Sequence, residues 1–342
     1  MDKLNIKLLA NKLNLSIGSV SKALNDSHEI SAVTKKRVLE MAAELNYTPN
    51  YYASSIKGRK SKTIGVVIPD CDNSYFSKAL NGMEAIAKEK GYHLIIHITH
   101  DDFLCEQSIL KSFQNGRVDG VIMSVASEIT HSDHVRELQE KQIPVVFFDR
   151  ICEDIKTAKI TTDDFESSYK ATQHLIECGC KKINLLAISK NLSIINERMS
   201  GYKKALSDHN IKYKSSDIIF CGNNTDTNNE ILKKILTSKN RPDGLIATVE
   251  ELIISVYTIC SELKLNIPDD VKTISFTNLE TASILNPSLT TITQPAYEMG
   301  KCVALALFKA LSIPEFNLND ESMILPSSLI IRNSTIKNFI QL

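Results

Sequence analysis

Polar and aromatic side chains follow four of the short apolar runs in this 342-residue chain. They are Asp70, Asn73, Tyr75 and Phe76 after TIGVVIP, Asp149 and Arg150 after PVVFFD, Glu250 after DGLIATV, and Asn278 after TISF. Carboxylates, amides and a guanidinium interleaved with aromatic rings suit a polyhydroxylated ligand, because rings cover its apolar faces and charged groups bind its hydroxyls in pairs. These residue types predict that the chain binds a small polar molecule such as a sugar.

From Thr63 onward, apolar runs alternate with helical stretches, which is typical of parallel sheets covered by helices. Eight runs are predicted strands, in two groups of four divided near residues 160–162: TIGVVIP, HLIIHIT, DGVIMSV and PVVFFD, then KINLLAI, DIIFCG, DGLIATV and VKTISF. Ligands of open α/β sheets bind beyond the carboxyl ends of the strands. The polar residues are therefore expected to meet in one cleft of an α/β fold.

The first 48 residues have a different pattern. Ile6, Leu9, Ala10 and Leu13 predict an amphipathic helix that Asn5 can cap. The string SIGSVSKALND, residues 16–26, predicts a second helix with Val20, Ala23 and Leu24 on one face, and a third helix follows over residues 34–45 after Ser31. Two short helices joined by a tight turn predict a helix-turn-helix, whose second helix enters the major groove of DNA.

Charge is distributed unevenly along the chain. Residues 1–62 contain eleven Lys or Arg against five Asp or Glu, a balance of +6, whereas the remainder has 29 basic and 35 acidic residues, a balance of −6. The net charge of zero hides this asymmetry. A basic head indicates contact with the phosphates of nucleic acid.

Five ordered motifs resemble those of the LacI/GalR family of transcription regulators, from residue 5 to about residue 334. They are SVSKALND, ISAVTKKRVLEMAAELNYTPN, YYASSIKGRKSKTIGVVIPD, NERMSGYKKAL and LTTITQPAYEMG. The resemblance implies a three-helix DNA-binding head, a hinge helix, and a two-lobed parallel-sheet core like that of periplasmic binding proteins. It also implies that a dimer binds a pseudo-palindromic operator and that a small effector alters this binding allosterically.

The expected domains are a head over 1–48, a hinge and linker over 49–62, and an effector-binding and dimerisation core over 63–342. We expect the chain to cross between lobes near Thr161, Ile292 and Leu325. The first lobe then comprises residues 63–161 and 293–324, and the second comprises residues 162–291 and 326–342.

Residues expected to contact DNA lie in the head and hinge. By the resemblance, Ile17 and Gly18 read bases, while Ser21, Lys22 and Asn25 touch phosphates or nearby base edges. In the hinge, Ile56 holds the position of a side chain that wedges into the minor groove. The full set is Asn5, Ser16, Ile17, Gly18, Ser19, Ser21, Lys22, Asn25, Ser31, Tyr47, Asn50, Ala53, Ser55, Ile56 and Lys57.

The hinge departs from the family pattern at two positions. Ile56 stands where relatives usually have leucine, and Ser54 stands where they have arginine. A β-branched residue forms helix less readily, and the loss of arginine removes a groove contact. We expect the hinge to bind DNA more weakly or with altered preference.

The resemblance adds Arg198 of NERMSGYKKAL to the effector site. The expected effector-binding residues are Asn73, Tyr75, Phe76, Asp149, Arg150, Arg198, Glu250 and Asn278. Glu250 replaces a common aspartate and reaches about one methylene further into the pocket, and Ile194 or Ile195 stands where relatives often place a hydroxyl. That wall is less polar, so no particular sugar is predicted.

Other function classes fit less well. The chain has no G-x-S-x-G, HExxH or glycine-rich phosphate loop, and His97, His100, His131 and His134 are expected to be solvated, so we predict no enzyme, cofactor or metal site. The eight cysteines are expected to be buried, reduced thiols. No export signal or membrane span is found, so the cytoplasm is expected.

Two matters remain open within the regulator class. The effector could be a sugar-like molecule, a nucleobase or another metabolite, or the protein could respond to no small molecule. The final residues, NSTIKNFIQL, are too short for a tetramer-forming leucine tail, so a homodimer is expected.

Overall fold

The computed structural model describes residues 5–24, 26–45, 47, 60–127, 131–222 and 224–336. The chain divides into two compact units, Met1–Ser61 and Lys62–Leu342, and each is described by itself. The predicted hinge contacts Asn50, Ala53, Ser55, Ile56 and Lys57, and Asn25 of the head, lie outside the described residues.

Three helices form the head: α1 (Ile6–Leu13), α2 (Ile17–Leu24) and α3 (Ala32–Glu44). Their apolar stripes meet in a small core that contains Leu9, Val20 and Val38, each at most 1% exposed. The predicted helix-turn-helix is thus present, with α1 and α2 joined by a tight turn.

Side-chain caps begin each of these helices. The Asn5 Oδ1 accepts a hydrogen bond from the Leu8 amide at 3.0 Å, and the Ser16 and Ser31 hydroxyls accept from the Ser19 and Thr34 amides. Asn14 ends α1 with a φ of +53°, a left-handed conformation that asparagine tolerates better than most residues. Local sequence therefore sets where α1 stops and α2 starts.

Two six-stranded sheets form the core. The first has the order β11-β5-β4-β3-β1-β2 and is parallel throughout. Its strands are β1 (Thr63–Ile68), β2 (His93–Ile98), β3 (Gly120–Met123), β4 (Val145–Phe148), β5 (Lys159–Thr162) and β11 (Met323–Leu325). The helices of this lobe are α5 (Ser74–Glu89), α6 (Phe103–Phe113), α7 (Asp133–Glu140), α12 (Ala296–Ser312) and the 3-10 helix η3 (Leu318–Glu321).

The second sheet has the order β12-β10-β9-β8-β6-β7, and only its edge strand β12 runs antiparallel. Its strands are β6 (Ile183–Ala187), β7 (Ile218–Phe220), β8 (Gly244–Ala247), β9 (Lys272–Phe276), β10 (Thr290–Thr293) and β12 (Ser328–Ile330). The helices here are α8 (Asp164–Glu177), α9 (Ser193–Asp208), α10 (Thr225–Leu236), α11 (Glu250–Glu262), η1 (Ser215–Asp217) and η2 (Glu280–Ser283). The two-lobed α/β fold predicted from the sequence is confirmed.

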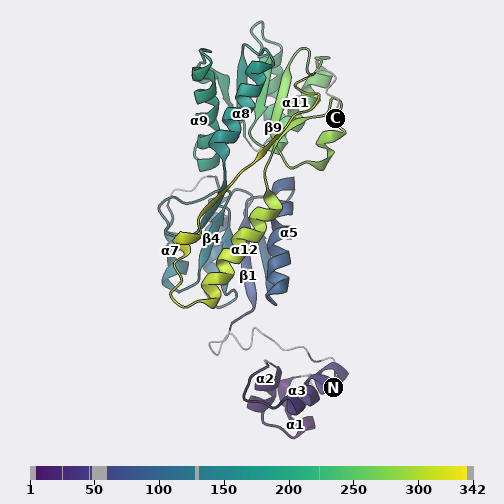
Figure 1. The fold of residues 1–342 in the computed structure, drawn as a ribbon, viewed down its shortest axis with the longest axis vertical. Helices are drawn as coiled ribbons and strands as arrows, with labels where there is room; N and C mark the ends of the chain where they lie inside the picture. Colours follow the sequence, from purple (N-terminus) through teal and green to yellow (C-terminus); the bar gives the residue numbers. More distant parts are fainter. Residues whose placement is uncertain are drawn as a thin grey trace. The chain divides into compact units, whose positions relative to one another are not determined.

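The chain passes between the sheets three times. It leaves β5 for α8 at Asp163, leaves β10 for α12 at Gln294 and Pro295, and leaves β11 for β12 at Pro326 and Ser327. Figure 1 shows these segments running between the two lobes of the core.

The prediction of eight strands was incomplete. All eight apolar runs are strands, but β5, β10, β11 and β12 were missed. Each has only three or four residues, and β5 (KITT) and β10 (TTIT) are rich in threonine and carry no apolar run. Their hydrogen bonds come from neighbouring strands, which hydrophobic periodicity does not report.

Glycines allow one helix pair in each lobe to pack closely (Figure 1). A Cβ added to Gly82 of α5 would lie 2.1 Å from the Tyr297 carbonyl oxygen of α12, and one added to Gly300 would lie 1.9 Å from the Ala79 oxygen. In the other lobe, a Cβ on Gly201 of α9 would lie 2.1 Å from the Phe165 oxygen of α8. The backbones of both helix pairs are therefore in direct contact, which only glycine permits.

Within the described ranges, no helix is both long and apolar enough to cross a membrane.

Candidate functional site

The carboxyl ends of strands from both sheets meet in a cleft between the lobes. At its centre lies a small cavity of about 40 Å³, the central cavity. Seven of the eight predicted effector residues line it: Asn73, Tyr75, Phe76, Asp149, Arg150, Arg198 and Glu250. The eighth, Asn278, lies next to it, because its Nδ2 donates at 2.6 Å to the backbone oxygen of Gln294, which also lines the cavity.

Arg198, on α9, is 2% exposed and held by protein groups. Its Nε donates to the Asp164 carboxylate at 2.7 Å, an Nη donates to the Thr248 carbonyl oxygen, and its guanidinium carbon lies 4.0 Å from the centre of the Phe276 ring. Burial raises the pKa of Asp164, and Arg198 opposes that shift by favouring the ionised carboxylate. Arg198 thus holds α8, the segment after β8 and the end of β9 together on one side of the cleft.

Asp149 directly follows β4 and has a left-handed backbone conformation, with φ of +59°. Such backbone in a non-glycine residue is unfavourable and is often found at functional sites. Burial raises the pKa of Asp149 to about 6, although Arg150 and Arg198 oppose the shift and the Ser124 hydroxyl donates to the carboxylate at 3.4 Å. An Nη of Arg150 donates to the Asp101 carboxylate, while the buried Arg150 Nε lies 3.9 Å from the Asp149 carboxylate and makes no hydrogen bond to any residue that the structure describes.

Glu250 joins the two lobes. From the first turn of α11, its carboxylate accepts a hydrogen bond from the Ser74 amide of α5 at 3.2 Å, and the hydroxyls of Ser74 and Thr277 also donate to it. The extra methylene relative to aspartate is therefore used to reach protein groups across the cleft.

Two more contacts cross the cleft beside Glu250. The Asn73 Nδ2 donates to the Glu251 carboxylate at 3.2 Å, and the Lys78 Nζ donates to the Asn278 carbonyl oxygen at 2.9 Å. Asn73 and Asn278 are thus linked to the opposite lobe by hydrogen bonds.

A larger cavity of about 330 Å³, the outer chamber, adjoins the central cavity and shares Asn73, Phe76, Arg150 and Val249 with it. Its other lining residues are Pro69, Asp70, His100, Asp101, Ile188, Gly222, Thr225, Asn228, Glu251, Leu252 and Ser255. Carboxylates and amides here face an apolar wall, as expected for a polar ligand with an apolar face.

Sequence reasoning did not single out several polar residues of the cleft, among them Asp101, Asp164, Glu251 and Gln294. Asp101 follows the apolar run HLIIHIT, and Asp164 and Gln294 follow β5 and β10, so the rule for strand ends would have found them had it been applied to every strand. Glu251 is adjacent to the predicted Glu250, and no sequence signal shows that Glu250 contacts Ser74 while Glu251 lines the outer chamber.

The head presents the predicted DNA-contacting side chains on α2. Ile17 is 45% exposed, and Gly18 beside it is also exposed. Ser16 and Ser19 hydroxyls lie 2.9 Å apart, and Lys22 forms an ion pair with Glu29 on the surface. Ser21 and Tyr47 are half-buried, whereas Asn5 and Ser31 act as helix caps.

The expectation that the histidines are solvated was wrong for His134. It is 6% exposed, and its Nε2 lies 2.7 Å from the carboxylate of the fully buried Glu106, which also accepts from the Ala126 amide at 2.7 Å. This pair ties α6 to α7 and to the loop after β3, and it lies away from the residues that line the cleft. Its position indicates a structural role.

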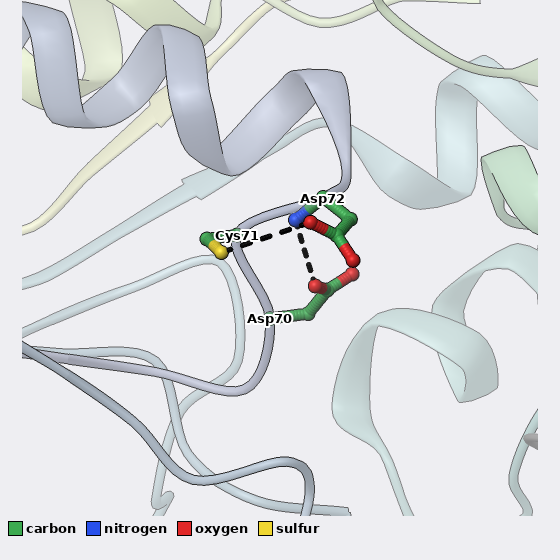
Figure 2. Close-up of side chains that lie close together, drawn as sticks. All are labelled: Asp70, Cys71 and Asp72. Carbon is green, nitrogen blue, oxygen red and sulfur yellow. Dashed lines mark hydrogen bonds between the residues drawn. The ribbon is translucent and has the colours of Figure 1, made fainter.

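The expectation that all eight cysteines are buried was also wrong, since Cys71 is exposed and Cys105, Cys178 and Cys302 are partly so, although all are free thiols. Figure 2 shows Cys71 between Asp70 and Asp72 in the loop between β1 and α5. The Asp72 amide donates to the Asp70 carboxylate at 2.8 Å, and the Cys71 thiol lies 3.9 Å from the Asp72 carboxylate. These bonds shape a turn that presents Asp70 to the outer chamber.

A helix-turn-helix head followed by a two-lobed α/β core with a polar cleft is the arrangement of a DNA-binding regulator. Residues 5–50 match the model of bacterial regulatory proteins of the lacI family, and residues 61–333 match that of periplasmic binding proteins and the sugar binding domain of the LacI family. The chain belongs to the LacI family. It is a DNA-binding transcriptional regulator and not an enzyme.

Individual relatives span almost the whole chain. The HTH-type transcriptional regulator RegA of Clostridium acetobutylicum is 33% identical over 322 residues, covering 91% of this chain and 93% of its own. The ribose operon repressor of Haemophilus influenzae is 28% identical over 329 residues, covering 96% and 98%. A LacI family regulator from Enterococcus faecium, solved with bound ribose, is 26% identical and has a TM-score of 0.70 over 80% of this chain and 98% of its own.

Proposed function

We propose that this regulator is a homodimeric repressor of carbohydrate-utilisation genes whose operator binding is controlled by a sugar-like effector held between the two core lobes. The observation that carries the proposal is the convergence of seven predicted polar and aromatic residues on one cleft, from strand ends of both sheets. Rings such as Phe76 suit the apolar face of a sugar, and carboxylates and guanidinium groups suit its hydroxyls. The names of two relatives, a ribose operon repressor and a regulator with bound ribose, support the same class of effector.

Cavity size favours the outer chamber as the place where the effector binds. Ligand pockets are typically about 300–1,000 Å³. The outer chamber, at about 330 Å³, reaches that range, whereas the central cavity, at about 40 Å³, does not. Asn73, Phe76 and Arg150 are therefore the expected direct contacts, and Arg198, Asp149 and Asn278 position the surrounding groups.

The proposed mechanism is a change in the angle between the lobes. The effector contacts Phe76 and Arg150 of one lobe and Asn228 of the other, so it stabilises one lobe arrangement over others. In a dimer, that change alters how the paired hinges around Ile56 and the α2 helices meet a pseudo-palindromic operator. Coupling of this kind is typically about 1–3 kcal/mol, or roughly 5- to 150-fold in operator affinity.

The test combines ligand binding with DNA binding. Purified protein would be screened by thermal shift against mono- and disaccharides, sugar acids, sugar phosphates and nucleobases, and each ligand that stabilises it would be added to an operator-binding assay. A sugar that raises Tm and changes operator affinity is expected. A nucleobase as the only active ligand would reject the carbohydrate proposal.

A second candidate, a regulator that needs no small molecule, is favoured by one observation. The Glu250 carboxylate joins the lobes through Ser74 of the other lobe, and Thr277 of its own lobe donates to the same carboxylate. Under this alternative, no screened compound changes operator affinity, but Glu250→Ala does. A response to a sugar in the unaltered protein would exclude it.

A further inference from the structure

The outer chamber has an unbalanced charge. Its lining contains three carboxylates, Asp70, Asp101 and Glu251, against the single guanidinium of Arg150, so its formal charge is −2 with His100 counted as neutral. Arg150 is already committed to Asp101 through a hydrogen bond at its Nη. Asp70 and Glu251 are therefore the two carboxylates of the described chamber lining that have no cationic side chain beside them in that lining.

The pKa of Glu251 is affected by this excess of negative charge. Its side chain is accessible to water, yet both lobes surround it, and the resulting desolvation raises the pKa of its carboxyl. Asp70 and Glu250, the charged neighbours that act on Glu251, raise the pKa further because they carry the same sign, and only the Asn73 amide opposes them from the side chains. A ligand that closed the chamber without a positive charge would desolvate these carboxylates at a cost.

A second group beside the chamber has an unmet hydrogen bond. The Nε of the buried Arg150 side chain, which is 7% exposed, lies 3.9 Å from the Asp149 carboxylate but makes no hydrogen bond to any described residue. A buried N–H donor without a hydrogen bond is unfavourable, so an acceptor such as a hydroxyl oxygen would stabilise it. Phe76, Val249 and Leu252 supply apolar surface in the same chamber.

We infer that the effector is a sugar bearing a positively charged amino group, with its ammonium facing Asp70 and Glu251 and a hydroxyl oxygen accepting from Arg150. This inference rests on the proposed function, because it names the class of ligand that the same cleft binds. Sugar phosphates and sugar acids are excluded from the chamber by repulsion from Asp70 and Glu251. Neutral sugars bind more weakly, because they leave both carboxylates without a counter-ion.

The experiment compares matched sugars by calorimetry on the full chain, at a pH where the amine is charged. Glucose, galactose and mannose would each be titrated in five forms: the parent sugar, the 2-amino sugar, the 6-amino sugar, the N-acetylated amine and the 6-phosphate. N-acetylation keeps the ring and removes the charge. An amino form is expected to bind roughly tenfold or more tightly than its parent and its acetylated form, the gain typical of a charge-assisted hydrogen bond.

Two variants link this preference to the chamber. Glu251→Gln and Asp70→Asn should each remove most of the preference for the amino form while retaining weak binding of the parent. Glu262→Gln is the matched control, because Glu262 lies at the other end of α11 and pairs with Lys233 on the surface. It should leave the preference unchanged, and a far-ultraviolet circular dichroism spectrum like that of the unaltered protein in all three variants would show that they fold.

The outcomes separate this inference from the proposed function. If the parent sugars or their phosphates bind as tightly as the amino forms and shift operator affinity, the inference fails and the proposed function stands. If no sugar in any form binds while the protein still binds its operator, both the inference and the carbohydrate effector are overturned. A preference for amino forms that Glu251→Gln leaves intact would also reject the chamber as the site.

Discussion

The Glu250 carboxylate of one lobe accepts a hydrogen bond from the Ser74 amide of the other lobe at 3.2 Å, across 176 positions of sequence. Thr277 donates to the same carboxylate from the segment after β9. Glu250, at the start of α11, therefore also caps the start of α5. Its one negative charge interacts favourably with the N-termini of both helices.

Removing this bridge should loosen the cleft. Glu250→Ala is expected to lower the free energy of unfolding by about 1–3 kcal/mol, because the half-buried donors of Ser74 and the buried hydroxyl of Thr277 lose their acceptor. Denaturant unfolding would measure the loss, and Glu262→Ala on the exposed end of α11 is the control. Equal effects of both changes would mean that the bridge contributes nothing specific.

Arg198 is predicted to act through Asp164. Arg198→Ala should cost about 3–5 kcal/mol of stability, because it leaves the buried Asp164 carboxylate without its partner. The double variant Arg198→Met with Asp164→Asn should recover much of that loss, since no uncompensated charge remains. Thermal unfolding of the single and double variants would check the pairing, and strictly additive losses would argue against it.

The pKa of Asp149 predicts a pH dependence. Because folding raises the pKa of this carboxyl from 3.8 to about 6, the folded state favours its protonated form. Its contribution to stability is fully present below pH 4 and is lost as the pH rises through 6, on the order of 3 kcal/mol in total. Asp149→Asn removes the titration, so the difference in stability between variant and unaltered protein should grow in favour of the variant across this window. A constant difference would contradict the assignment.

Because α5 and α12 pack closely, we predict that position 300 tolerates no side chain larger than that of glycine. Gly300→Ala places a methyl 1.9 Å from the Ala79 oxygen, so the helices must separate, at a cost of about 1–3 kcal/mol or more. Gly222→Ala is a suitable control, because nothing lies within 4 Å of a Cβ there. Comparable Tm values for the two variants would show that the helices can adjust freely.

Lys22 offers a test of the DNA-binding face. If it contacts a phosphate, Lys22→Ala should reduce the slope of log affinity against log salt concentration by about one. Glu29→Gln should strengthen operator binding a few-fold, because it removes the ion pair that competes for Lys22 and a negative charge from the face. Fluorescence anisotropy over a salt series would measure both, and an unchanged slope in Lys22→Ala would place Lys22 away from the phosphates.

The sequence by itself determined the local elements and the class of protein. Periodic apolar residues and the caps Asn5, Ser16 and Ser31 specify the head helices, and eight apolar runs specify eight strands, because these signals depend on neighbours within one or two turns. The rule that ligands bind beyond strand ends selected seven of the eight expected effector residues, and six of those seven line the central cavity, whereas Arg198 was added by the family resemblance.

Only the tertiary structure decided what those residues do there. Glu250 is bonded to Ser74, Arg198 to Asp164 and Asn278 to Gln294, so several of the expected effector residues also hold the cleft together. These partners lie far apart in the sequence, and only the packing of the two lobes brings them into contact. The same packing gives the central cavity a volume of about 40 Å³ and the acidic outer chamber about 330 Å³, a difference that no local pattern of residues encodes.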